Sequence, residues 1–312
     1  MSLRIAALQM RTSPDRAVTL ARAAGLIALA AKRGADLVCL PEAFTGLYGV
    51  DYFAHNAEEF KGSSSGSAMM AGAAAEHRIY VCGGVIERHP ISGAMYNTIA
   101  AFDPLGLEVA RYRKIHLSRV SVGADTTSEG DVLKAGDSLG WFDVPDTSPG
   151  ADGRGWRVGL ANCFDLRFAS LHSMLSAAPP DGVGAEVVLY PASWLKTTGV
   201  LGHWETLLKA RALDGQCYVL GVSNARDETH DPVAYGHSAI IGPMGETLAA
   251  CGNDEADEVV VASLSLAALV DARRRIPLGA AGRPLVCADA LRAQQQDPRA
   301  MGRPPAGWSP AQ

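Results

Sequence analysis

Three side chains of this sequence, Glu42, Lys114 and Cys163, could take part in chemistry, and each follows a short run of apolar residues. Such runs predict buried strands, and ligands and catalytic groups gather at the carboxyl ends of strands in open α/β sheets. A thiolate can attack an electrophilic carbon, a carboxylate can accept the thiol proton, and an ammonium can stabilise the oxyanion that results. The three residue types together indicate acyl transfer.

Cys163 is the residue on which this interpretation depends most. It closes the apolar run 158–162 and opens the segment 164–168. A strand that ends at a nucleophile and turns into a helix presents the side chain at an elbow, where the helix N-terminus and a nearby ammonium would lower the pKa of the thiol. A free cysteine taken alone is more often a core residue, and Glu42 or Lys114 taken alone is more often solvated. Only their combination favours catalysis.

Hydrophobic periodicity and turn residues predict the elements that would position these side chains. Strands alternate with helices, 103–106 and 243–246 have the composition of hairpin turns, and 44–53, 146–155 and 176–184 that of loops. This order favours an α/β fold in which a mixed sheet is covered by helices. The predicted strands are 5–10, 35–42, 79–86, 96–102, 107–112, 158–162, 186–191, 217–223, 238–241 and 258–262, and the predicted helices are 15–32, an Ala-rich stretch after 66, 163–175 and 204–213.

The composition limits the classes of function. Of the 312 residues, 48% are hydrophobic and 20% charged, which is ordinary for a globular protein. The net charge of -5 argues against a surface for nucleic acid or anionic membranes, because such surfaces need clustered Lys and Arg. The sequence contains no repeat of fixed period and no linker-like break, so one domain is expected. The expected partner is a small-molecule substrate.

The cysteines predict the compartment. None forms a C-x-x-C pair, and scattered thiols in apolar runs are typical of a reducing environment. The first residues lead directly into a predicted strand without the pattern of a signal peptide, and the longest Ala-rich stretch, 17–31, is too short and too polar to span a bilayer. A cytoplasmic location is therefore expected, and no zinc spacing of Cys or His is present. The six cysteines are Cys39, Cys82, Cys163, Cys217, Cys251 and Cys287.

Three segments resemble the signature blocks of the nitrilase superfamily, the carbon-nitrogen hydrolases: 40–42 (LPE), 112–117 (YRKIHL) and 162–168 (NCFDLRF). The resemblance extends from about 4 to 284 through further blocks at 96–98, 190–194, 235–238 and 273–277. It implies a four-layer αββα sandwich, an active site of Glu, Lys and Cys, no metal or organic cofactor, and a homodimer or larger homo-oligomer. A single carbon-nitrogen hydrolase domain is expected over 1–284, with a C-terminal tail over 285–312.

The resemblance also implies roles for individual residues. Glu42 would be the general base, Lys114 the cation that stabilises the oxyanion, and Cys163 the nucleophile that becomes a thioester. The backbone N–H of Phe164, next to the nucleophile, would complete the oxyanion hole. Glu129 lies where many members have a second glutamate near the lysine.

Within the superfamily, the segments 42–49, 225–227 and 235–237 are most similar to the omega-amidase branch. Members of that branch hydrolyse the terminal amide of short dicarboxylic monoamides and release ammonia. By this resemblance Tyr48 and Trp194 would line the pocket, and a cation, with Arg167 as a candidate, would bind the distal carboxylate. The alternatives are a nitrilase, an N-carbamoyl-amide hydrolase or a deaminated-glutathione-type amidase of the same superfamily, and, less favoured, a non-catalytic binding protein on the same fold.

Neighbouring polar residues have local interpretations. Asp165 and Arg167 are spaced as an ion pair that would support the turn after Cys163. His116 and His237 raise the alternative of a Cys-His dyad, which would require an imidazole within hydrogen-bond reach of the sulfur.

Overall fold

The structure is a computed structural model that describes residues 2–60, 65–122, 125–146, 155–252 and 254–278, with the side chains of 120–127 left undescribed. Its contacts divide the chain into a large unit, Met1–Ala272, and a small one, Arg273–Gln312. The predicted domain end at 284 and the predicted tail over 285–312 lie outside the described residues.

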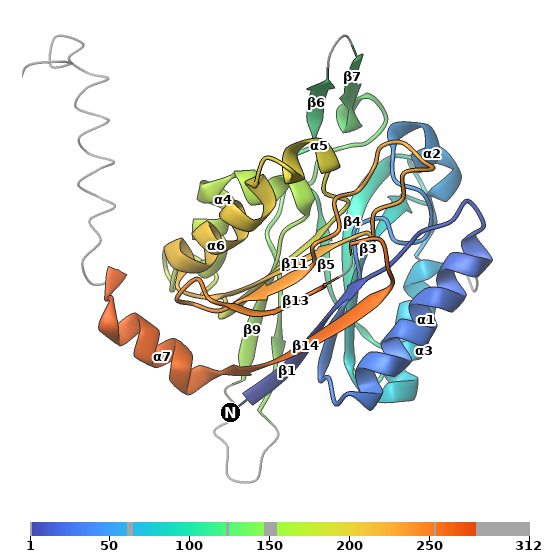
Figure 1. Cartoon of the computed structure of the whole chain (residues 1–312). Coiled ribbons are helices and arrows are strands. Elements are labelled where there is room, and N and C mark those ends of the chain that lie inside the picture. The colour runs from blue at the N-terminus through green and yellow to red at the C-terminus, as the bar shows by residue number, and fades with distance from the viewer. Residues whose placement is uncertain (1, 61–64, 123–124, 147–154, 253, 279–312) are drawn as a thin grey trace, which may run out of the picture. The chain divides into compact units, whose positions relative to one another are not determined.

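Two six-stranded sheets form the centre of the large unit (Figure 1). In the first sheet β1, β2 and β3 are parallel and the outer strands pair antiparallel, and the second sheet repeats this plan around β9, β10 and β11. The first sheet has the order β14 (Glu258–Ser265), β1 (Ser2–Gln9), β2 (Leu37–Cys39), β3 (Tyr80–Arg88), β4 (Met95–Phe102) and β5 (Glu108–Arg113). The second has the order β13 (Thr247–Ala250), β12 (Ala239–Ile241), β11 (Tyr218–Ser223), β10 (Val187–Ala192), β9 (Trp156–Leu160) and β8 (Gly140–Val144).

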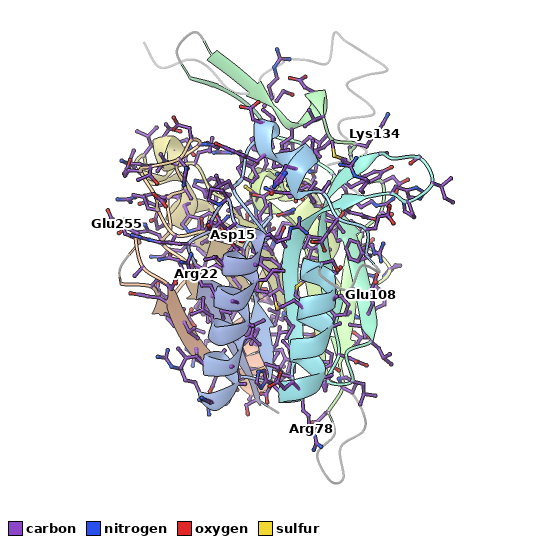
Figure 2. The ribbon with its side chains drawn as sticks, turned by 90° about the vertical axis from the view of Figure 1, so that its right-hand side faces the viewer. Asp15, Arg22, Arg78, Glu108, Lys134 and Glu255 are labelled. Carbon is purple, nitrogen blue, oxygen red and sulfur yellow. The ribbon has the colours of Figure 1, made fainter. Side chains whose placement is uncertain are left out.

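Helices cover the outer face of each sheet. Helices α1 (Arg16–Lys32) and α3 (Gly66–His77) lie side by side over the first sheet, as Figure 2 shows, and share a buried apolar cluster with it. Helices α4 (Ala169–Ser176) and α6 (His203–Gly215) cover the second sheet in the same way. A further cluster fills the space between the two sheets. The order helix, sheet, sheet, helix confirms the predicted four-layer αββα sandwich.

The alternation of side chains along β1 explains why its sequence is apolar throughout. Ile5 and Ala7 point into the core between the sheets, whereas Ala6 and Leu8 pack under the helices. Successive side chains of a strand point to opposite faces, so a strand covered on both sides needs apolar residues at every position. Asp15 then starts α1, because its side chain accepts a hydrogen bond from the backbone N–H of Ala17 at 2.8 Å.

Most predicted elements match the structure, but the segment after the cysteine, several short elements, strand β8 and the helix after β14 differ from the prediction. The single helix predicted over 163–175 is a 3-10 helix, η2 (Cys163–Arg167), followed by α4. The segment predicted as a loop over 44–53 contains the start of α2 (Val50–Asn56). A hairpin of β6 (Arg119–Val122) and β7 (Asp125–Ser128) and a short helix α5 (Lys196–Gly199) were not predicted, and helix α7 (Leu266–Arg275) follows β14. Of the predicted surface insertion over 146–155, residues 147–154 lie outside the described part.

No helix among the described residues is long and apolar enough to cross a membrane.

Candidate active site

The three side chains picked out in the sequence come together from two sheets. Glu42 follows β2 and Lys114 directly follows β5, both in the first sheet, whereas Cys163 begins η2 after β9 of the second sheet. Glu42 and Lys114 are completely buried, and Cys163 retains 7% of its exposure. The carboxyl ends of these strands therefore deliver a carboxylate, an ammonium and a thiol to one place between the sheets.

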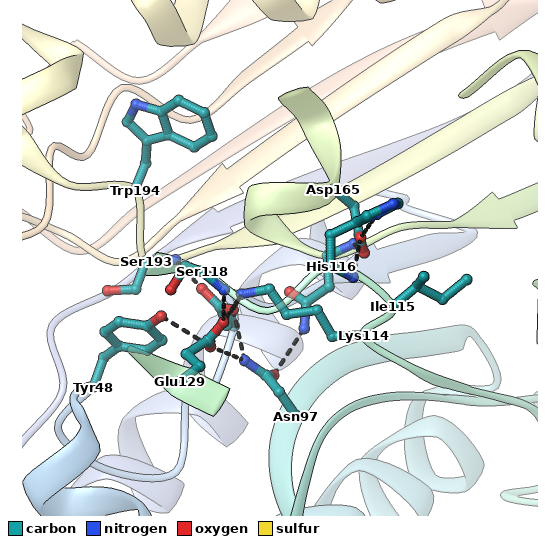
Figure 3. Close-up of polar contacts among 12 residues, drawn as sticks. Tyr48, Asn97, Lys114, Ile115, His116, Ser118, Glu129, Asp165, Ser193 and Trp194 are labelled. Carbon is teal, nitrogen blue, oxygen red and sulfur yellow. Dashed lines mark hydrogen bonds and ion pairs between the residues drawn. The ribbon is translucent and has the colours of Figure 1, made fainter. Parts of the chain in front are cut away.

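Lys114 lies between two carboxylates (Figure 3). Its Nζ is 2.8 Å from Oε1 of Glu42, 2.8 Å from Oε2 of Glu129 and 3.0 Å from Oε1 of Glu129. Burial disfavours the ammonium, but Glu129 and Glu42 outweigh burial, so the pKa of Lys114 lies well above its ordinary value. Glu129 begins the 3-10 helix η1 (Glu129–Asp131) directly after the β6–β7 hairpin.

The two carboxylates have opposite pKa shifts. Burial, helped by the negative charge of Glu129, raises the pKa of Glu42 in spite of Lys114. For Glu129, Lys114 and hydrogen bonds from Ser118 and Asn97 outweigh the effect of burial, and its pKa is lowered. Of the two carboxylates, Glu42 therefore takes up a proton more readily than Glu129.

The two carboxylate oxygens of Glu42 accept different numbers of hydrogen bonds. Its Oε1 accepts from Lys114 at 2.8 Å and from the side-chain amide of Asn97 at 2.7 Å, whereas Oε2 accepts from the backbone N–H of Ser193 at 2.8 Å. A carboxylate oxygen has two acceptor directions, so Oε1 is filled and Oε2 keeps one. A hydrogen bond with Glu42 is also among the influences on the Cys163 thiol.

Cys163 has a strained backbone and a weakly acidic thiol. Its φ of +47° lies in the left-handed region, which non-glycine residues seldom adopt outside functional turns. Burial raises the pKa of the Cys163 thiol well above its ordinary value, and Glu42 adds to the effect. The prediction that the elbow lowers this pKa is wrong for the free protein, because two carboxylates surround a dry thiol that only one ammonium offsets. The thiol needs a base to react.

The turn after Cys163 is held by Asp165, but not through Arg167. The carboxylate of Asp165 accepts from the backbone N–H of Asn162 at 2.9 Å, from the Tyr112 hydroxyl at 2.6 Å and from the backbone N–H of His116 at 3.0 Å. Its Oδ1 also lies 2.7 Å from the His116 Nδ1. The predicted ion pair of Asp165 with Arg167 is wrong, because these contacts surround the carboxylate and Arg167 points to another group of residues.

Arg167 lies at the pocket instead. Its guanidinium donates to the Thr198 hydroxyl at 3.2 Å, lies 3.3 Å from Nδ1 of His203, and stands over the Trp194 ring at 4.6 Å from the ring centroid. In the described part of the chain no carboxylate forms an ion pair with it. Burial lowers its pKa, although Arg stays charged in proteins.

A cavity of about 430 Å³ borders the thiol. Glu42 and Lys114 are completely buried and do not line the cavity. The other residues that the sequence suggested for catalysis or substrate binding do line it. Side chains of α2 and α5, which were not predicted, supply much of the remaining wall. The lining residues that the sequence suggested are Tyr48, Glu129, Cys163, Phe164, Arg167 and Trp194.

The two candidate histidines are engaged elsewhere. The Nδ1 of His116 is bonded to Asp165, and the His237 ring stacks on Tyr235 at 4.0 Å between centroids, with its Nδ1 bonded to the Tyr235 backbone oxygen at 3.0 Å. His237 is also absent from the described lining of the cavity. Among the described residues, no group of three or more His, Cys, Asp or Glu side chains is placed to hold a metal ion.

Asn97 is a site residue whose position the sequence reasoning did not assign. It lies in β4, is completely buried, and bonds to both Glu42 and Glu129. The signal that could have found it is an amide within a strand of mostly apolar residues, because a buried polar group needs partners. Tyr48 was suggested only as a pocket residue, yet its hydroxyl also donates to Glu129 at 3.0 Å.

A buried cysteine beside a glutamate and a lysine, at the strand ends of an αββα sandwich, defines a hydrolase of the nitrilase type. Residues 4–274 match the carbon-nitrogen hydrolase family. The chain belongs to this family, and it is an enzyme that hydrolyses carbon–nitrogen bonds.

Comparison with individual proteins gives the same assignment. The chain is 38% identical over 278 residues to omega-amidase NIT2 of Bos taurus, covering 89% of this chain and 94% of the relative. It is 39% identical over 276 residues to omega-amidase NIT2 of Xenopus tropicalis, covering 88% and 93%. The crystal structure of Nit3 of Saccharomyces cerevisiae, a member of branch 10 of the nitrilase superfamily, is similar with a TM-score of 0.75 and 28% identity, covering 89% of this chain and 95% of that one.

Proposed function

We propose that the protein hydrolyses the terminal amide of a small dicarboxylic acid monoamide and releases ammonia and a carboxylic acid. The observation that carries this proposal is the guanidinium of Arg167, which borders the same cavity as Cys163 and has no carboxylate partner among the described residues. An amide with a distal carboxylate would neutralise that cation while its carbonyl faces the thiol. The similarity to omega-amidase NIT2 proteins supports the same substrate class.

In the first step the Cys163 sulfur attacks the amide carbon as its proton passes to Glu42. Oε2 of Glu42 would accept the proton, because in the described contacts it accepts one hydrogen bond, from Ser193, whereas Oε1 accepts two. The raised pKa of the Glu42 carboxyl suits this role, since a base works best when its pKa lies close to the operating pH. Attack breaks the C=O π bond and moves its electron pair onto the oxygen.

The resulting oxyanion would be stabilised by Lys114 and by the backbone N–H of Phe164. Two of the three close contacts of the Lys114 Nζ go to oxygens of one carboxylate, Glu129. One N–H can therefore turn to the oxyanion while the ammonium keeps a contact with each glutamate. The positive φ of Cys163 sets the direction of the next peptide, and with it the Phe164 N–H.

Collapse of this intermediate releases ammonia. Glu42 returns its proton to the leaving nitrogen, the C–N bond breaks, and the acyl group stays on sulfur as a thioester. Water then enters, Glu42 takes one of its protons, and the hydroxide adds to the thioester carbon. Breakage of the C–S bond, with return of that proton to sulfur, yields the carboxylic acid and the free thiol.

Product release from a panel of substrates tests the assignment, measured as ammonia for the primary amides, the nitrile and the N-carbamoyl amide, and as the amine cysteinylglycine for deaminated glutathione. The panel contains a dicarboxylic monoamide such as 2-oxoglutaramate, an uncharged amide of equal length, a nitrile, an N-carbamoyl amide and deaminated glutathione. The proposal expects the highest kcat/KM for the short monoamide with a distal carboxylate. A preference for the nitrile, the N-carbamoyl amide or deaminated glutathione would replace this function by the corresponding alternative in the same family.

We also propose a quaternary state from the family resemblance and a location from the cysteine pattern. A homodimer or larger homo-oligomer is expected, and light scattering coupled to gel filtration measures it directly, a monomeric mass being the contrary result. The cytoplasmic location predicted from the cysteine pattern is tested by fractionation of the cells that express the chain.

A further inference from the structure

Asn97, an uncharged and unreactive residue, lies at the centre of the polar cluster of Glu42, Lys114 and Glu129. Its Nδ2 donates to Oε1 of Glu42 at 2.7 Å and to Oε1 of Glu129 at 3.0 Å. Its backbone oxygen accepts from the backbone N–H of Lys114 at 2.8 Å. One residue of β4 thus contacts both carboxylates and the backbone of Lys114.

The orientation of the Asn97 amide is fixed by Asn162. The Nδ2 of Asn162 donates to Oδ1 of Asn97 at 2.8 Å, so the opposite end of the Asn97 amide faces the carboxylates (Figure 3). A flipped amide would place its oxygen against two carboxylate oxygens and its N–H groups against another N–H donor, and both contacts are repulsive. Asn162 immediately precedes Cys163, which connects this orientation to the turn that carries the nucleophile.

Donation by Asn97 matters because, among the described contacts, Glu42 and Glu129 share one ammonium, that of Lys114. In the same contacts the Tyr48 hydroxyl donates to Glu129 and not to Glu42. Hydrogen bonds donated to a carboxylate stabilise its ionised form and lower its pKa. Asn97 supplies two such bonds without adding charge, which neither Asp nor an apolar residue can do.

We infer that Asn97 is a positioning residue that keeps Glu42 in its ionised, proton-accepting form and holds both glutamates against Lys114. It touches neither substrate nor sulfur in the described contacts, and acts through the two carboxylates. The inference deepens the proposed function, because it rests on Glu42 being the base. It makes a prediction that a purely structural role does not make, namely a defined change in how the site titrates.

Removal of Asn97 should make the base harder to ionise. In Asn97→Ala the pKa of the Glu42 carboxyl rises, so the acid limb of the rate profile moves to higher pH by about one unit, which corresponds to one lost hydrogen bond to a charged group. Asn97→Asp should move it further, because a third carboxylate adds repulsion. Asn97→Ser keeps one donor and should give a smaller shift than Asn97→Ala. Asn162→Ala should shift the limb in the same direction by less than Asn97→Ala, since the amide stays but loses its orientation.

The test uses the full chain and two readouts. The first is the pH dependence of acylation by p-nitrophenyl acetate, followed as the burst of p-nitrophenolate, with mass spectrometry to locate the acyl group. The second is infrared titration of the buried carboxyl groups, which requires no reaction. Neither readout uses an amide, so both can still be measured if the proposed substrate class is wrong. An acyl group on a residue other than Cys163 would contradict the proposed nucleophile and not the role of Asn97.

A matched control separates positioning from loss of stability. Asn56 is also a buried asparagine, and its side chain donates to the Leu47 backbone oxygen at 2.7 Å, away from the carboxylates. Asn56→Ala should lower the free energy of unfolding without moving the acid limb. If Asn97→Ala does not fold, Asn97→Ser and Asn162→Ala supply the measurement. Folded variants of Asn97 with the wild-type acid limb and infrared titration, or with a shift to lower pH, would overturn the inference.

Discussion

Glu42 and Cys163 reach the same site from opposite sheets. Glu42 follows β2 of the first sheet, and Cys163 begins η2 behind β9 of the second. The carboxylate meets the thiol only when the two sheets pack on the apolar layer between them. Base and nucleophile are therefore assembled by the same burial that stabilises the fold, and the surrounding dry environment sets the pKa values of both.

Replacement of Lys114 should damage both catalysis and stability. Lys114→Ala leaves Glu42 and Glu129 buried without a counter-ion, which costs about 3–5 kcal/mol of the free energy of unfolding. It also removes the cation proposed to stabilise the oxyanion. Urea unfolding and ammonia release measure the two effects, with Lys196→Ala as the stability control, because the exposed pair of Lys196 with Glu228 contributes at most about 1 kcal/mol. Near-native turnover of Lys114→Ala would contradict its assigned role.

Replacement of Arg167 should change the choice of substrate more than the chemistry. Arg167→Met should lower kcat/KM for a monoamide with a distal carboxylate by about 10- to 100-fold, the effect of one or two charge-assisted hydrogen bonds. The uncharged amide of equal length should lose much less, because it has no anion to neutralise. Steady-state assays on both amides give the comparison. Equal losses on the two substrates would mean that Arg167 supports the turn rather than the substrate.

Glu129→Gln should shift the rate profile in the direction opposite to the Asn97 variants. The negative charge of Glu129 raises the pKa values of both Glu42 and Cys163, so removing that charge lowers both. The acid limb of kcat/KM is expected to move to lower pH, with a lower kcat because Lys114 loses one anionic partner. Glu228→Gln, at an exposed glutamate, serves as the control. An unchanged or upward-shifted acid limb would show that Glu129 does not act on the titration of the base.

Acid stability should depend on His172. Burial lowers the pKa of His172 to about 4 from an ordinary value of 6.5, and its ring lies between the Tyr190 hydroxyl and the Cys217 thiol. Between these two values the unfolded chain binds the proton and the folded chain does not, so stability is present above pH 6.5 and is lost as the pH falls toward 4. The loss amounts to about 3 kcal/mol.

Urea unfolding at a series of pH values measures this dependence. The variant His172→Gln should flatten the decrease in stability between pH 6.5 and 4, whereas His55→Gln, at an exposed histidine, should leave it as in the wild type. An equally steep decrease in His172→Gln would assign acid sensitivity to other groups.

The sequence predicted the layers of the fold well because its strands are buried on both faces. Apolar runs such as 5–10 and 217–223 correspond to β1 and β11, and the turns at 103–106 and 243–246 connect β4 with β5 and β12 with β13. The β6–β7 hairpin was missed because the apolar alternation of 119–122 (RVSV) is only four residues long and 125–128 (DTTS) contains no apolar residue. Its pairing depends on backbone hydrogen bonds, which composition does not reveal.

The sequence predicted which residues belong to the site better than it predicted their contacts. Positions at strand ends follow from the order of elements, so Glu42, Lys114 and Cys163 could be picked out as candidates. The partners of Asp165 could not, because spacing along the chain suggested Arg167 while the fold supplies Tyr112 and His116. The raised pKa of the Cys163 thiol depends on its burial and on how close Glu42 and Glu129 lie to it, and only tertiary structure determines both.

Mass spectrometry of the protein quenched during turnover of a monoamide tests most directly whether Cys163 is the nucleophile. The predicted result is an acyl adduct on Cys163 in the wild type and no adduct in Cys163→Ala. In Glu42→Gln the adduct should accumulate only if the substitution slows deacylation more than acylation. An adduct on Cys39, Cys82, Cys217 or Cys251, or amide hydrolysis at the wild-type rate by Cys163→Ala, would contradict the assignment of Cys163 as the nucleophile.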